Sequence, residues 1–105
     1  MFKKFLILLI LSNALFANQS YTKAQVEKMI AKMVILGFYG QNITANDKIY
    51  QDIKKYDLGG VILFDKDPTN KRKYKNVVDP KQLKTLTSKL QNIRAEKLLI
   101  SIDQE

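Results

Sequence analysis

The residues best suited to chemistry are two carboxylates, Asp103 and Glu105, which follow a run of apolar or small residues in the segment 98–105, LLISIDQE. A short run of this kind, with no polar alternation, is typical of a strand buried on both faces of a parallel sheet. In α/β folds, ligands bind just beyond the carboxyl ends of such strands. The pattern therefore predicts that Asp103 and Glu105 lie where a substrate would be held.

The composition excludes several kinds of catalysis. The chain has 105 residues, and neither histidine nor cysteine occurs among them. A Ser-His pair, an imidazole acid/base, a thiolate nucleophile and a His-ligated metal therefore cannot come from this chain. We expect no metal and no cofactor.

The elements that would position the carboxylates alternate along the chain. Helices are predicted after three caps, Ser20 or Thr22, then Thr44, then Asp79, which is followed by Pro80. Capping-box spacing is present in Thr22 with Gln25 and in Asp79 with Gln82. The second helix is expected to end before Leu58-Gly59-Gly60, with Gly59 as the helix breaker. The apolar residues of these helices recur at helical spacing and should be buried; they are Val26, Met29, Ile30 and Met33, then Ile49, Ile53 and Tyr56, then Leu83, Leu86, Leu90 and Ile93. Strands are predicted over 33–38, 60–64 and 98–102.

This alternation predicts an α/β fold built from βα units around a parallel sheet. Right-handed crossovers would bring the carboxyl ends of all three strands to one edge. Three strands cannot close a barrel, so we expect residues 18–105 to be the opening of a larger α/β domain.

The first 17 residues are predicted to be a signal peptide. Lys3 and Lys4 precede an apolar run over 5–11, and the segment ends in the small residue Ala17. The expected location is the periplasm or the cell exterior. The alternative is an uncleaved inner-membrane anchor, although the apolar run is shorter than the roughly 20 residues that a spanning helix needs.

The net charge of +8 would favour binding to a polyanionic partner. One loop, 65–78, concentrates basic residues around Tyr74, namely Lys66, Lys71, Arg72, Lys73 and Lys75. The loop is interpreted either as a patch for phosphate or another polyanion, or as a solvated mobile loop. We expect no nucleic-acid partner.

Four segments in order, MVILGFYG, DLGGVILF, DPKQLKTLTSKLQ and LLISIDQE, resemble the N-terminal barrel domain of glycoside hydrolase family 3. The ending IDQE is similar to the β-N-acetylhexosaminidase branch, in which a Gly-Gly pair usually follows. The resemblance covers about 28–105. It implies the first three βα units of a (β/α)8 barrel that hydrolyses β-glycosides with retention, with β-linked N-acetylglucosamine as substrate class and a β-glucosidase as the runner-up.

The resemblance also implies roles for single residues. It assigns Asp103 to binding the sugar hydroxyls in the −1 subsite, and Glu105 is interpreted as support for the loop backbone. In the family, the nucleophilic Asp lies far downstream, and a loop His serves as acid/base. Neither can be placed here, so no catalytic residue is assigned, and the fragment alone is expected to be inactive.

Asp103 and Glu105 are unsuited to be the catalytic pair themselves. Two residues apart on a strand, their side chains leave on one face, about 6.5–7 Å apart along the strand. Retaining pairs stand roughly 5–5.5 Å apart and flank the scissile bond. Two alternative functions remain open: a secreted, non-catalytic module that binds anionic polymer through Lys66–Lys75, and a non-functional gene remnant.

Overall fold

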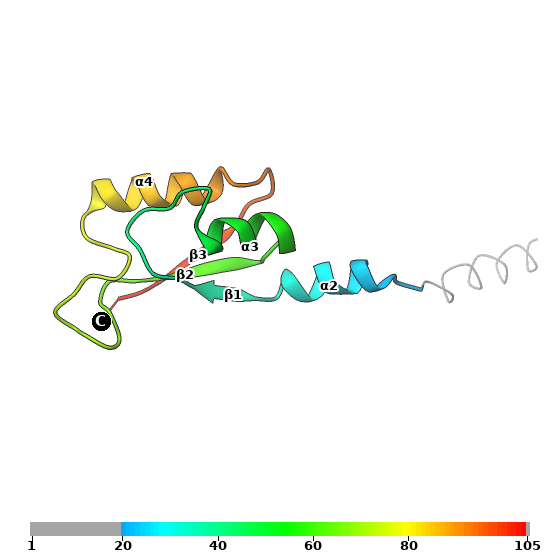
Figure 1. The fold of residues 1–105 in the computed structure, drawn as a ribbon, viewed down its shortest axis with the longest axis horizontal. Coiled ribbons are helices and arrows are strands. Elements are labelled where there is room, and N and C mark those ends of the chain that lie inside the picture. The colour runs from blue at the N-terminus through cyan, green and yellow to red at the C-terminus, as the bar shows by residue number, and fades with distance from the viewer. Residues whose placement is uncertain (1–19, 105) are drawn as a thin grey trace, which may run out of the picture.

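The computed structural model describes residues 20–104, which fold as a small α/β domain (Figure 1). Helices and strands alternate as the sequence predicts, in the order α2 (Lys23–Ala31), β1 (Ile35–Gly37), α3 (Lys48–Tyr56), β2 (Gly60–Phe64), α4 (Pro80–Gln91) and β3 (Leu99–Asp103). The leader and Glu105 lie outside the described residues.

The three strands form one parallel sheet in the order β1-β2-β3. Gly60 in β2 pairs with Ile35 on one side and with Leu99 on the other. At the opposite end, Phe64 pairs with Asp103. Because the strands are parallel, their carboxyl ends meet at one edge of the sheet, as predicted.

One face of the sheet carries both crossover helices (Figure 1). Ile53 of α3 and Leu86 of α4 join Val61 and Leu63 of β2 in one buried core. Side chains alternate along a strand, so the intervening residues face the other way. On that other face, which we call the open face, Ile35 is 46% exposed and Leu99 is 57% exposed.

The apolar face predicted for the first helix is not buried, so that prediction is wrong. Val26, Met29 and Ile30 are exposed, and Met33 just beyond α2 is 84% exposed. The helix touches the domain near its end, where the Ala31 carbonyl accepts from the N–H of Gly59 at 2.9 Å. Figure 1 shows α2 extending away from the sheet, which leaves its apolar stripe uncovered.

The predicted N-cap of α3 is also wrong. The N-cap is Asp47 and not Thr44, and the Asp47 carboxylate accepts from the N–H of Thr44 at 2.6 Å. At its other end α3 stops before Leu58, as predicted, and Asp57 at the C-cap takes the left-handed conformation, with φ 62°. The capping box of Thr22 and Gln25 at the start of α2 is confirmed.

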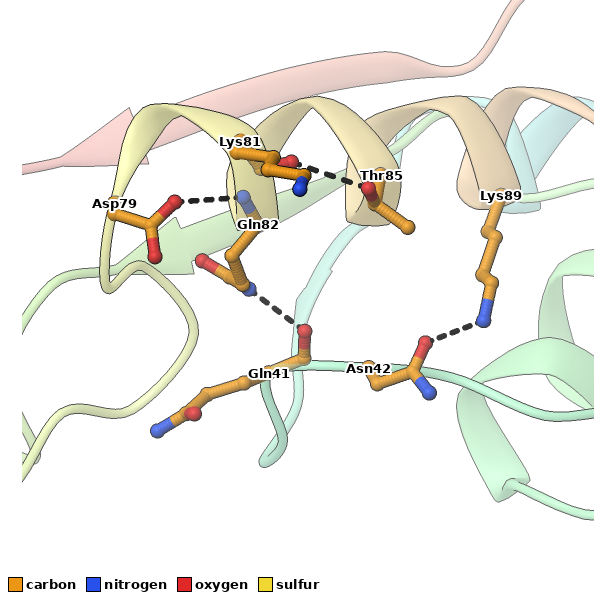
Figure 2. A pocket seen from close by; sticks show the side chains of 7 residues that line it. All are labelled: Gln41, Asn42, Asp79, Lys81, Gln82, Thr85 and Lys89. Atoms are coloured by element: carbon orange, nitrogen blue, oxygen red, sulfur yellow. Dashed lines mark hydrogen bonds between the residues drawn. The ribbon is translucent and has the colours of Figure 1, made fainter.

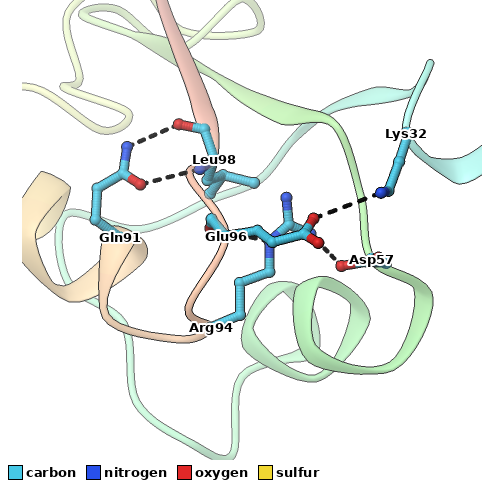
Figure 3. Close-up of polar contacts among 6 residues, drawn as sticks. All are labelled: Lys32, Asp57, Gln91, Arg94, Glu96 and Leu98. Atoms are coloured by element: carbon cyan, nitrogen blue, oxygen red, sulfur yellow. Dashed lines mark hydrogen bonds and ion pairs between the residues drawn. The ribbon is translucent and has the colours of Figure 1, made fainter.

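Asp57 faces Arg94, which follows α4 (Figure 3). Arg94 Nη1 lies 3.2 Å from Asp57 Oδ1, and the two side chains are only 13% and 25% exposed. This ion pair joins the end of α3 to the turn before β3. Nearby, both ends of the Gln91 amide bond the backbone of Leu98, at 2.7 and 3.0 Å.

We expect Arg94→Met to lower the free energy of unfolding by about 1–3 kcal/mol, because it strands a half-buried carboxylate at a left-handed residue. Urea unfolding followed by circular dichroism measures the change. Lys32→Met breaks the exposed pair with Glu96 (3.5 Å) and is the matched control, with an expected cost of at most about 0.5 kcal/mol. Equal effects of the two substitutions would contradict the prediction.

Candidate functional site

Asp103 is the last residue of β3 and lies at the carboxyl edge of the sheet, where the sequence placed it. It lines a cavity of about 130 Å³, which we call the strand-end cavity. The other lining residues come from the end of β2 and the segment that follows it; they are Phe64, Asp65, Lys66, Asp67, Pro68 and Lys71. The predicted binding residue therefore faces a hollow built by the neighbouring strand.

The segment 65–78 is held in place by its own backbone. Lys66 and Tyr74 form an antiparallel bridge, and the N–H of Asp67 donates to the carbonyl of Lys73 at 2.9 Å. The N–H of Lys75 donates to the carbonyl of Asp65 at 3.1 Å. The backbone of the basic loop is thus folded into an internally hydrogen-bonded turn over the strand end.

Asn76 ties this loop to two strands, and sequence reasoning did not find it. Its side chain is 0% exposed. Oδ1 accepts from the N–H of Phe64 at 3.0 Å, and Nδ2 donates to the carbonyls of Phe38 at 3.1 Å and Gly40 at 2.9 Å. One amide therefore satisfies three backbone groups at the carboxyl ends of β1 and β2.

The charges around the strand-end cavity are mixed. Three of its residues are aspartates and two are lysines. The Asp67 carboxylate accepts from the hydroxyl of Thr69 at 2.7 Å and from its N–H at 2.8 Å, and these bonds hold the pKa of Asp67 below its usual range. Such a lining offers both acceptors and donors to hydroxyl groups, and its carboxylates would repel a polyanion.

Among residues 20–104, no group of three or more acidic side chains is gathered closely enough to hold a metal ion. Within the same range, no helix is long and apolar enough to cross a membrane. Glu105, expected to support the site, lies outside the described residues, as does the leader that was expected to direct export.

A second hollow, about 330 Å³ in volume, lies between the start of α4 and the segment after β1 (Figure 2). Its polar groups largely bond one another: Gln82 Nε2 donates to the carbonyl of Gln41 at 2.6 Å, and Lys89 Nζ donates to Asn42 at 2.6 Å. Asp79 caps α4 as predicted, but Gln82 Oε1 accepts from Val78 and does not complete a capping box. We assign this hollow a structural role.

Comparisons of the chain with protein-family models, with curated proteins and with solved structures found no match. We therefore base the proposed function on the residues at the strand ends and on the motifs that bring them there.

Proposed function

We propose that residues 18–105 belong to the N-terminal (β/α)8 barrel domain of a retaining glycoside hydrolase of the β-N-acetylhexosaminidase type. The observation that carries the proposal is the position of Asp103 beside a polar cavity at the carboxyl edge of a parallel sheet. Active sites of (β/α)8 barrels are built at this edge. The four sequence motifs that resemble the family supply the choice of reaction.

The arrangement of the layers supports the barrel. Consecutive parallel strands with both crossover helices on one face are what a barrel wall requires, with the helices outside. The open face would then point toward the barrel interior. Its exposed Ile35 and Leu99 are the bulky residues that fill such interiors, and further strands would cover them.

The role proposed for Asp103 is to orient the sugar. A carboxylate accepts hydrogen bonds from two neighbouring hydroxyls and so fixes the ring against the reacting groups. Retaining hydrolysis also needs a nucleophile and an acid/base. We assign neither to residues 20–104, and both would come from other parts of the enzyme. The mixed charge of the strand-end cavity disfavours the alternative of a module that binds anionic polymers.

The first test is to sequence the gene beyond the codon for Glu105. We expect codons for Gly-Gly, followed in later βα units by a nucleophilic Asp and an acid/base His. The full-length protein that the gene encodes is then assayed with 4-nitrophenyl N-acetyl-β-glucosaminide. Asp103→Asn should lower kcat/KM by about 10- to 150-fold, which corresponds to one lost charged hydrogen bond. Glu27→Gln removes an exposed carboxylate on α2 and should leave the rate unchanged.

Two results would overturn the proposal. One is a gene that supplies no such nucleophile or acid/base. The other is a product in which Asp103→Asn and Glu27→Gln behave alike.

A further inference from the structure

The exposed apolar residues of α2 form one stripe that is turned away from the domain. We call this set the α2 stripe; its members, all exposed, are Val26, Met29, Ile30 and Met33. At about 100° of rotation per residue, they fall within less than a third of the helix circumference. The residues at the end of α2 that meet the domain, the partly buried Ala31 and the following Lys32, lie outside this arc.

The domain does not use the α2 stripe for its own folding. The helix is attached through its carboxyl end, where the Ala31 carbonyl accepts from the N–H of Gly59 at 2.9 Å. Away from this contact it extends beyond the sheet (Figure 1). Within residues 20–104, none of the stripe side chains belongs to the buried core. A contiguous apolar surface that is left exposed in this way marks an interaction site.

The charges around the α2 stripe are mainly positive. The lysines of the helix and its C-cap are Lys23, Lys28 and Lys32, and the one acid is Glu27. Lys23 lies 3.8 Å from Glu27, and Lys32 lies 3.5 Å from Glu96. Both pairs are solvent-exposed and therefore weak, so these lysines can exchange their partners for other anions.

This combination fits an anionic lipid surface better than a second copy of the chain. An apolar stripe with lysines around it is the pattern of a helix that lies in the plane of a membrane. Tyr21, exposed just before α2, has the amphipathic ring that suits the boundary between lipid and water. A second copy packed on the stripe would bring like charges together, whereas anionic headgroups attract lysines. The predicted leader ends at Ala17, only a few residues before α2, and export would bring this helix to a membrane.

We propose that α2 is a membrane-surface helix that binds anionic lipid, with the α2 stripe at the level of the acyl chains and the lysines among the headgroups. The proposal goes beyond the hydrolase activity and does not rest on it. α2 leads into the amino end of β1, whereas Asp103 lies at the carboxyl edge of the sheet. A protein held by α2 therefore keeps the strand-end cavity on the edge opposite the lipid, open to solvent.

The test is co-sedimentation of the full-length protein, without residues 1–17, with vesicles made of equal parts of phosphatidylglycerol and phosphatidylcholine. Without the leader, binding reports on the folded protein alone. We expect binding that weakens as salt is added and is at least about tenfold weaker on phosphatidylcholine alone. Met33→Ser should weaken binding about tenfold, because it removes apolar area from the acyl boundary. Lys28→Gln should weaken it about threefold to fivefold, through the loss of one charge near the lipid.

Val78→Ser and Lys84→Gln are the matched controls, because they change exposed residues away from α2, and both should bind as the wild type does. Met33 is exposed and outside the core, so Met33→Ser should also hydrolyse soluble 4-nitrophenyl N-acetyl-β-glucosaminide at the wild-type rate. The two proposals can therefore fail separately. A wild-type protein that does not bind the anionic vesicles overturns the lipid proposal and shows that a second copy or another part of the protein covers the stripe. Equal binding of Met33→Ser and Val78→Ser overturns it as well.

Discussion

Gly59→Ala should lower the free energy of unfolding by at least about 3 kcal/mol. Gly59 lies where the chain passes the end of α2 on its way into β2. A Cβ built on it would overlap the carbonyl oxygen of Lys32 and lie 2.8 Å from its carbonyl carbon. The obstacle is backbone, which cannot rotate aside as a side chain would. Relief requires α2 to move and breaks the 2.9 Å bond between Gly59 and Ala31.

Gly37→Ala is the control, because it makes the same change in the neighbouring strand. Its Cβ would meet only side-chain atoms, at 3.6 Å or more, which is ordinary van der Waals contact. We expect a change within about 0.5 kcal/mol, since alanine also loses less backbone freedom on folding. Urea unfolding of both variants measures the difference. Equal stabilities would show that α2 is not seated against β2 as described.

The order of elements could be predicted because each one carries its own local signal. Asp79 followed by Pro80 marks the start of α4, and Leu86 and Leu90 recur at helical spacing on its buried face. The apolar run 60–64 is β2 without a shift of either end. Because parallel strands meet at one edge, the position of Asp103 followed from the element order alone.

The errors arise where a residue's surroundings and not its type decide the outcome. Met29 and Met33 have the right spacing for a buried face, but within residues 20–104 no element packs over them. Asn76 was missed for the same reason: its three bonding partners include two residues more than 35 positions earlier.

Asn76→Ala is expected to lower the free energy of unfolding by about 2–4 kcal/mol and to loosen the site. It leaves the N–H of Phe64 and the carbonyls of Phe38 and Gly40 without their partner in a place that water does not reach. Asn70→Ala removes an exposed side chain from the same loop and should cost at most about 0.5 kcal/mol. Comparable losses from the two changes would contradict the role given to Asn76.

Asn76→Asp tests the hydrogen bonds without changing the packing, because the Asn and Asp side chains have the same shape. The oxygen that accepts from the Phe64 N–H is kept, but the Nδ2 donor is replaced by an oxygen that faces the carbonyls of Phe38 and Gly40. Burial and those carbonyls raise the pKa of the new carboxyl above its unfolded value of about 3.9. The unfolded state then binds fewer protons than the folded one between the two pKa values, so stability falls as the pH rises through that window. This carboxyl therefore contributes most to stability below about pH 4, where its neutral form donates one hydrogen bond. Urea unfolding at pH 3.5 and at pH 7 should show that the free energy of unfolding falls more for Asn76→Asp than for the wild type as the pH rises. A variant whose stability relative to wild type is unchanged over this range would mean that the amide does not face the two carbonyls.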